Sequence, residues 1–223
     1  MLTFIAVALA VGAVAVGMGW WLRRADELGR PRRFPWVSVV VLSALAVAAV
    51  VPGVARASQE RRLGAAASVL AGAPVAVRCQ SLGQAVLDGG PELGYVRWRS
   101  DGTPEPWALI KRDQCRHLAA YERSGKRRPT RDEVVAVHVL THEAMHLAGR
   151  LSEAGAECAA VQRDARTARL LGAEPADAAR LAATYWSEVY PLMPGGYRSE
   201  QCQAGGSMDE ALPDAPWLAP GRP

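Results

Sequence analysis

Residues 141–158, THEAMHLAGRLSEAGAEC, hold the side chains whose types and spacing could do chemistry. His142 and His146 are four residues apart, so on one helix they point the same way and can share one zinc ion. Glu143 stands beside the first histidine, where it can act as general base toward a metal-activated water and then protonate a leaving amine. This pattern predicts zinc-dependent hydrolysis of peptide bonds.

A catalytic zinc ion needs a third protein ligand and keeps one position open. Glu153 and Glu157 stand on one face of the next predicted helix, just after the turn that folds it back. We expect Glu153 to be the third ligand and Glu157 to hold a ligand histidine by its free N–H group. The reverse assignment stays open. So does the alternative that both are surface carboxylates favoured by a helix N-terminus.

At these residues the chain resembles the gluzincin group of zinc metallopeptidases. HEAMH matches their H-E-x-x-H motif, and SEAGAE is similar to the N-E-x-x-x-D signature of the thermolysin-like branch. The resemblance implies a zinc cofactor, with Glu153 as ligand and Glu157 orienting a histidine. It suggests a small, membrane-anchored zinc metallopeptidase of bacterial type. It covers residues 141–158 and not the whole chain.

The motif also departs from that family. The gap from His146 to Glu153 is much shorter than in thermolysin-like enzymes, and Ser152 and Glu157 replace the Asn and Asp of the signature. HEAMHLAG looks like the first part of the metzincin pattern as well, but Ser152 occupies the place of the third ligand of that group. These differences leave the third ligand as the open question of the site.

Two further positions could touch the site. His138 precedes His142 by one turn, although a core or surface histidine is the favoured interpretation. Tyr197 is a candidate oxyanion stabiliser, as is its neighbour Arg198, if a disulfide at Cys202 holds this segment near the zinc.

The helices that must carry these residues have clear start and stop signals. Thr130 stands three residues before Glu133, which predicts a capped helix start ahead of the histidines. Gly149 is the natural stop of that helix. Ser152 can cap the next helix, which we expect to run to about Leu171.

Ahead of the helices, three runs rich in Val, Tyr, Trp and Ile predict short strands that begin at Pro74, Gly94 and Trp107. The last two are expected to pair as a hairpin across a longer loop. From Asp113 onward the pattern is helical.

Two uncharged apolar runs, 2–22 and 34–54, each reach the roughly 20 residues of a membrane-spanning helix. The arginine-rich segment 23–33 between them predicts a cytoplasmic loop, with both termini outside. A competing interpretation makes 23–33 and 35–54 a signal peptide that is cleaved near Ala57. Both interpretations export everything after residue 57.

All four cysteines follow the second apolar run. An even number in an exported domain suggests two disulfides, although four cysteines allow three connectivities. We expect Cys79 to pair with Cys115, and Cys158 with Cys202.

The sequence thus predicts a mostly helical α+β protein. Residues 1–57 form a membrane anchor with two transmembrane helices, 58–73 a linker or short helix, and 74–223 a compact, extracytoplasmic zincin-like domain with a small β-sheet. We expect a two-pass protein of the cell membrane, in contact with the lipid bilayer, that cleaves a peptide or protein substrate. No nucleic-acid partner is expected, because the basic cluster at 126–131 lacks interleaved aromatic residues. The alternative is a non-catalytic extracytoplasmic zinc-binding or interaction domain.

Overall fold

The computed structural model describes residues 2–23, 25 and 29–217. The chain divides into two compact units, Met1–Ser58 and Gln59–Pro223. As predicted, the protein is mostly helical α+β, with two long apolar helices at the N-terminus and a small three-stranded mixed sheet.

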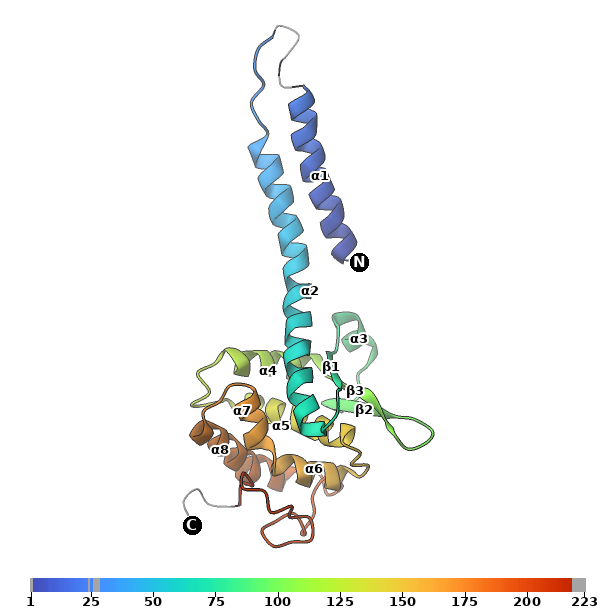
Figure 1. Ribbon diagram of the computed structural model, residues 1–223, viewed down its shortest axis with the longest axis vertical. Coiled ribbons are helices and arrows are strands. Elements are labelled where there is room, and N and C mark those ends of the chain that lie inside the picture. Colours follow the sequence, from blue (N-terminus) through green and yellow to red (C-terminus); the bar gives the residue numbers. More distant parts are fainter. Residues whose placement is uncertain (1, 24, 26–28, 218–223) are drawn as a thin grey trace. The chain divides into compact units, whose positions relative to one another are not determined.

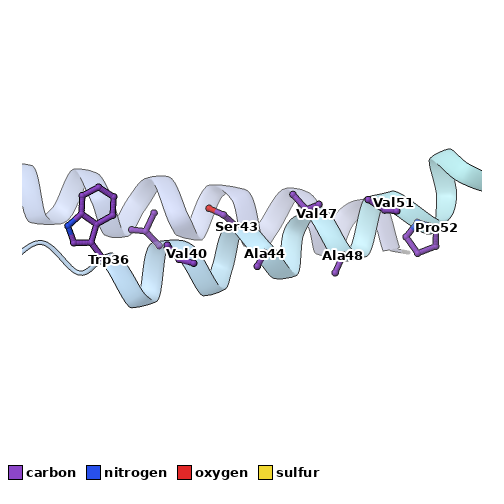
Figure 2. A pocket seen from close by; sticks show the side chains of 9 residues that line it. Trp36, Val40, Ser43, Ala44, Val47, Ala48, Val51 and Pro52 are labelled. Atoms are coloured by element: carbon purple, nitrogen blue, oxygen red, sulfur yellow. The ribbon is translucent and has the colours of Figure 1, made fainter.

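The first unit consists of helix α1 (Leu2–Leu22) and the beginning of α2 (Trp36–Ala71), which run alongside each other (Figure 1). Both helices are long and apolar enough to cross a membrane, by length and composition. A shallow groove follows α2, and Figure 2 shows its mostly apolar lining. The labelled side chains are Trp36, Val40, Ser43, Ala44, Val47, Ala48, Val51 and Pro52. Such an apolar exterior is typical of a helix that faces lipid.

Helix α2 continues into the second unit, where Leu63 and Ala67 are fully buried in the core. Residues 58–73, expected to be a linker or a short helix, are therefore helical as far as Ala71. The division of the chain into a membrane anchor and an exported domain stays a prediction.

The sheet has the strand order β1-β3-β2. Its strands are β1 (Ala76–Cys79), β2 (Gly94–Trp98) and β3 (Pro104–Ile110). Strands β2 and β3 are antiparallel, so the predicted hairpin is confirmed, while β1 runs parallel to β3. A short helix that the sequence did not indicate, α3 (Leu82–Leu87), lies between β1 and β2 along the chain.

Helix α5 lies at the centre of the second unit and packs on β2, β3 and the helices α4, α6 and α7 (Figure 1). The helices are α4 (Arg112–Arg123), α5 (Arg131–Leu147), α6 (Glu153–Val161), α7 (Asp164–Leu170) and α8 (Pro175–Thr184). A π-helical turn (Tyr185–Val189) and a 3-10 turn (Tyr190–Leu192) extend α8.

The prediction of one continuous helix from Ser152 to about Leu171 is wrong, because the chain breaks at Gln162 into α6 and α7. Gln162 is fully buried and bonds to the C-terminal segment. Its side-chain amide donates to the main-chain oxygen of Met208 (3.0 Å) and accepts from the main-chain N–H of Glu210 (2.7 Å). The break is thus held by contacts with residues far away in the sequence.

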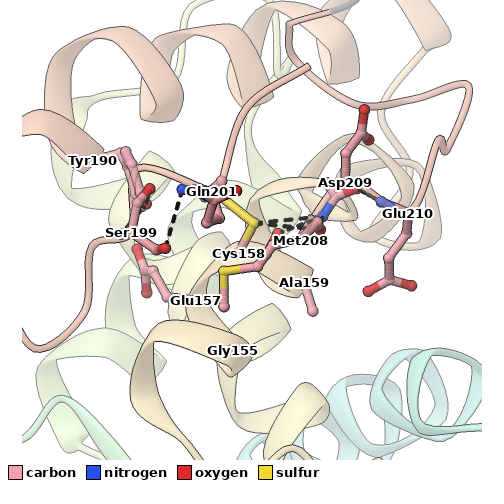
Figure 3. The surroundings of a disulfide bond; sticks show 12 residues. Gly155, Glu157, Cys158, Ala159, Tyr190, Ser199, Gln201, Met208, Asp209 and Glu210 are labelled. Carbon is pink, nitrogen blue, oxygen red and sulfur yellow. Dashed lines mark hydrogen bonds between the residues drawn. A yellow bond between two sulfur atoms is a disulfide. The ribbon is translucent and has the colours of Figure 1, made fainter. Parts of the chain in front are cut away.

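The predicted disulfides are confirmed: Cys79 is bonded to Cys115, and Cys158 to Cys202. The second bond ties α6 to the C-terminal segment directly beside Glu157 (Figure 3). Two disulfides and no free cysteine indicate an oxidising compartment.

Candidate metal centre

Residues at each end of helix α5, which carries the two motif histidines, determine where the helix begins and ends. At its start, Thr130 and Glu133 form the predicted capping box, in which each side chain bonds to the main-chain N–H of the other residue. At its end, Gly149 takes a φ of 91°, which a residue with a side chain rarely adopts. Between these limits, His142 and His146 lie one turn apart on one buried face.

Three side chains of the motif converge on one point. The Nε2 atoms of His142 and His146 are 3.0 Å apart, and Oε2 of Glu153 lies 3.1 Å from the first and 3.4 Å from the second. Glu153 comes from the first turn of α6, where Ser152 caps the helix by accepting from the main-chain N–H of Gly155. One divalent ion could be held by these three atoms.

The other nitrogen of each ring is already bonded. Nδ1 of His142 contacts Oε2 of Glu157 at 3.0 Å, and Nδ1 of His146 contacts the main-chain oxygen of Arg150 at 2.7 Å. Acceptors at Nδ1 hold the single hydrogen of a neutral imidazole there, so each Nε2 presents a lone pair. The lone pairs of the two Nε2 atoms and of the Glu153 carboxylate then face one another. Such an arrangement is stabilised by a cation between them.

Electrostatics at this point agree with the geometry. Burial lowers the pKa of His142, but hydrogen bonds with Glu153 and Glu157 outweigh it and raise the pKa to about 9. The pKa of His146 is lowered, mainly by burial and to a smaller extent by the charge on His142. A positive charge is therefore favoured between the three side chains, and in the metal-free chain a proton on His142 supplies it.

A second group that could hold a metal ion consists of His138, His142 and Glu157. All three side chains are buried, being 3%, 9% and 1% exposed. By contrast, the side chain of Glu153 is 48% exposed, so the group that contains it is the one open to solvent. The group with Glu153 is thus the more exposed of the two, which suits the free position that a catalytic ion requires.

Glu143 is buried against strand β2 at the edge of the same cavity. A Cβ atom added at Gly94 would lie 2.8 Å from its Oε1, so any side chain at position 94 would push the carboxylate from this position. Its Oε2 has no hydrogen-bond partner among the described residues. Burial raises the pKa of Glu143 to about 7, which suits a group that takes up and releases a proton near neutral pH.

A cavity of about 590 Å³ opens over these residues, and members of both groups that could hold a metal ion border it. One part of its lining is apolar, made by Val135, Val139, Val189 and Met193. Tyr197 also lines it, with its ring centroid 5.9 Å from that of His142, and burial raises the pKa of its hydroxyl. Arg198 does not line the cavity and instead donates to the main-chain oxygen of Pro191.

Sequence reasoning missed part of this site. His138 is buried, in agreement with the favoured core position, but it also contacts Glu157 and Asp164 and so belongs to the site. Its spacing of four residues from His142 was the available signal. Tyr185 also reaches the site, because it donates its hydroxyl to Glu157 (2.7 Å). Asp164 had no signal, because the helix break that places it is made by tertiary contacts.

These buried histidines predict a pH-dependent stability. Burial lowers the pKa of His138, but the charges of Asp164 and Glu157 outweigh it and raise the pKa to about 10. Because His138 and His142 hold protons more tightly in the native state, the stability that these two rings contribute is fully present below pH 6.5 and is lost as the pH rises toward 9 and 10. Urea unfolding of the chelator-treated chain should show a loss of at least about 1.4 kcal/mol per pH unit between pH 7 and 9. A constant unfolding free energy over that range would mean that both rings are neutral.

Comparisons of the chain with protein-family models, with curated proteins and with solved structures find no match. What the structure shows about function is therefore chemical: a buried cluster of histidines and glutamates could hold a metal ion.

Proposed function

We propose that this chain is a membrane-anchored, zinc-dependent peptidase of the gluzincin type, with His142, His146 and Glu153 as the metal ligands. The observation that carries the proposal is the convergence of two Nε2 atoms and one carboxylate oxygen within 3.0–3.4 Å while both Nδ1 atoms are occupied by acceptors. Nitrogen and oxygen donors in this number suit a catalytic zinc site. A bound zinc ion would acidify water and polarise a carbonyl group.

The remaining steps belong to side chains around the cavity. Glu143 accepts a proton from the attacking water and delivers it to the leaving amine, a role supported by its unpartnered oxygen and its raised pKa. Glu157 orients His142 through Nδ1. Tyr197 donates its hydroxyl to the developing oxyanion, a role supported by its position in the lining of the same cavity.

A non-catalytic zinc-binding domain is the second candidate, favoured by the closed group of His138, His142 and Glu157. A fully buried ion has no open position and would only stabilise the fold. Changing Glu153 to alanine separates the two candidates. It weakens zinc binding if Glu153 is a ligand and leaves it unchanged if the closed group holds the ion.

The experiment that tests the proposal uses the full chain purified in detergent. We expect one zinc ion per chain by elemental analysis and cleavage of an unfolded protein substrate. A chelator should stop the cleavage, and added zinc should restore it. A chain without zinc, or one whose zinc supports no cleavage, would refute the peptidase assignment.

We also propose that α1 and the first part of α2 cross the membrane and that the cavity lies outside the cytoplasm. The apolar length of both helices and the two disulfides support this placement. A reporter enzyme that is active only outside the cytoplasm, fused after Pro223, should be active. An inactive fusion would place the site in the cytoplasm and would contradict the proposal.

Gly94, at the start of strand β2, should be important for activity because it leaves room for the carboxylate of Glu143. In a Gly94→Ala chain the new methyl group would meet Oε1 of Glu143 at 2.8 Å and its Cγ at 3.0 Å, so the carboxylate must move. Since small misplacements of a reacting group can cost up to about 100-fold, we expect kcat to fall by about 10- to 100-fold while zinc stays bound. Gly83→Ala is the matched control, because a Cβ there meets nothing within 4 Å. Equal kcat values for the two variants would show that Glu143 tolerates the crowding.

A further inference from the structure

A continuous series of contacts between buried polar side chains leads from the metal centre into the core. His138 contacts Oδ2 of Asp164 through Nδ1 (2.8 Å) and Oε2 of Glu157 through Nε2 (3.0 Å). Glu157 in turn contacts Nδ1 of His142 at 3.0 Å. This series of contacts therefore joins α7, α5 and α6, and it ends on His142, a ligand of the proposed zinc site.

Glu157 is held from every side. Its Oε1 accepts from the hydroxyl of Tyr185 at 2.7 Å, and its Oε2 contacts both His138 and His142. The ring of Tyr185 also stacks on that of His138, with centroids 3.6 Å apart and an angle of 9°. Neither the carboxylate nor the imidazole can rotate without losing several of these contacts.

The contacts also determine where hydrogens lie. A ring between two carboxylates needs one hydrogen in each contact, since oxygen and an unprotonated nitrogen would repel. Whether the imidazole or Asp164 holds the hydrogen between them, the hydrogen at Nε2 of His138 points at Glu157. With its second oxygen bound by Tyr185, Glu157 is left to accept from Nδ1 of His142.

We propose that Asp164, His138 and Tyr185 are positioning residues of the metal centre, which hold Glu157 against His142 and so direct Nε2 of His142 at the ion. The proposal rests on the proposed function, because it assigns a task to groups around that zinc site. Stability alone does not account for the cluster, since buried ionic groups are often no more stabilising than apolar packing. Partners of metal ligands, by contrast, typically change metal affinity by about 10- to 100-fold.

The test compares two substitutions on α7 in the full chain in detergent. Asp164→Asn keeps the shape of the side chain and removes its charge. Thr167→Val, one turn further along, removes an equally buried hydrogen bond between α5 and α7, from Oγ1 of Thr141 to Oγ1 of Thr167 (2.8 Å). With a competing chelator, we expect about 10-fold weaker zinc binding in Asp164→Asn and unchanged binding in Thr167→Val. The visible spectrum of the Co²⁺-loaded chain should shift only in the first variant.

A milder variant covers the case in which Asp164→Asn does not fold. Tyr185→Phe keeps the stacked ring and removes only the hydroxyl contact to Glu157, so it should fold and bind zinc several-fold more weakly. Unchanged zinc affinity in the folded variants, or an equal loss in Thr167→Val, would overturn the inference while the peptidase proposal stands. A second zinc ion per chain that is lost when His138 is changed to alanine would also overturn it, because His138 would then be a ligand. A wild-type chain without zinc would refute the proposed function itself.

Discussion

A chain in which His146 is changed to alanine should purify without zinc under conditions that leave one ion on the wild-type chain. The substitution removes one of three donors that converge within 3.4 Å and leaves His142 and Glu153 alone. The affinity should fall by more than the roughly 10- to 100-fold that follows the loss of a ligand's outer partner. Elemental analysis after dialysis against a weak chelator measures the loss, and cleavage of the unfolded protein substrate should stop with it.

His117→Ala provides the matched control for this experiment. His117 lies on α4 and does not line the cavity, so its removal should change neither zinc content nor cleavage. Retention of zinc by the His146→Ala chain would direct attention to the closed group of His138, His142 and Glu157. It would contradict the assignment of the open group as the metal centre.

The Glu143→Gln chain should keep its zinc and lose cleavage by about 10²- to 10⁴-fold, the usual contribution of a general acid–base group. Glutamine has the shape of the glutamate but cannot accept a proton at neutral pH. The fold should be at least as stable as the wild type, because burial penalises the charge of this carboxylate and raises its pKa to about 7. Loss of kcat together with retained zinc and unchanged unfolding would locate the defect in proton transfer.

Glu133→Gln is the control on the same helix. Glu133 is also buried, but it serves the N-terminal cap of α5, where an amide oxygen can still accept from the main-chain N–H of Thr130. This chain should cleave at close to the wild-type rate. If Glu143→Gln cleaves as fast as the control, another group takes the proton and the base assignment is wrong.

Much of the helix that carries the site could be predicted from the sequence, because the signals act within a few residues of one another. The Thr130 cap, the Gly149 stop and the Ser152 cap all function as expected. The facing of His142 and His146 follows from the helical repeat alone. These features need no partner from elsewhere in the chain.

Which glutamate contacts which nitrogen of the histidines could be decided only from the folded structure. Both glutamates lie on one face of α6, so the sequence predicted Glu153 as the ligand and Glu157 as the partner of a histidine but left the reverse assignment open. The turn between α5 and α6 brings Glu153 to the Nε2 atoms and Glu157 to Nδ1 of His142. The disulfide pairing was likewise one of three choices until the packed structure brought the cysteines together.

The sequence by itself determined the local parts of this protein: two apolar helices, a capped helix with two histidines on one face, and strands in a hairpin. Only the tertiary structure decided that α6 ends at Val161, that Asp164 contacts His138, and that Tyr185 bonds to Glu157. The physical reason is the range of the forces involved. Caps and helical spacing act between residues one turn apart, whereas a buried polar group takes its hydrogen-bond partner from whatever segment packing brings beside it.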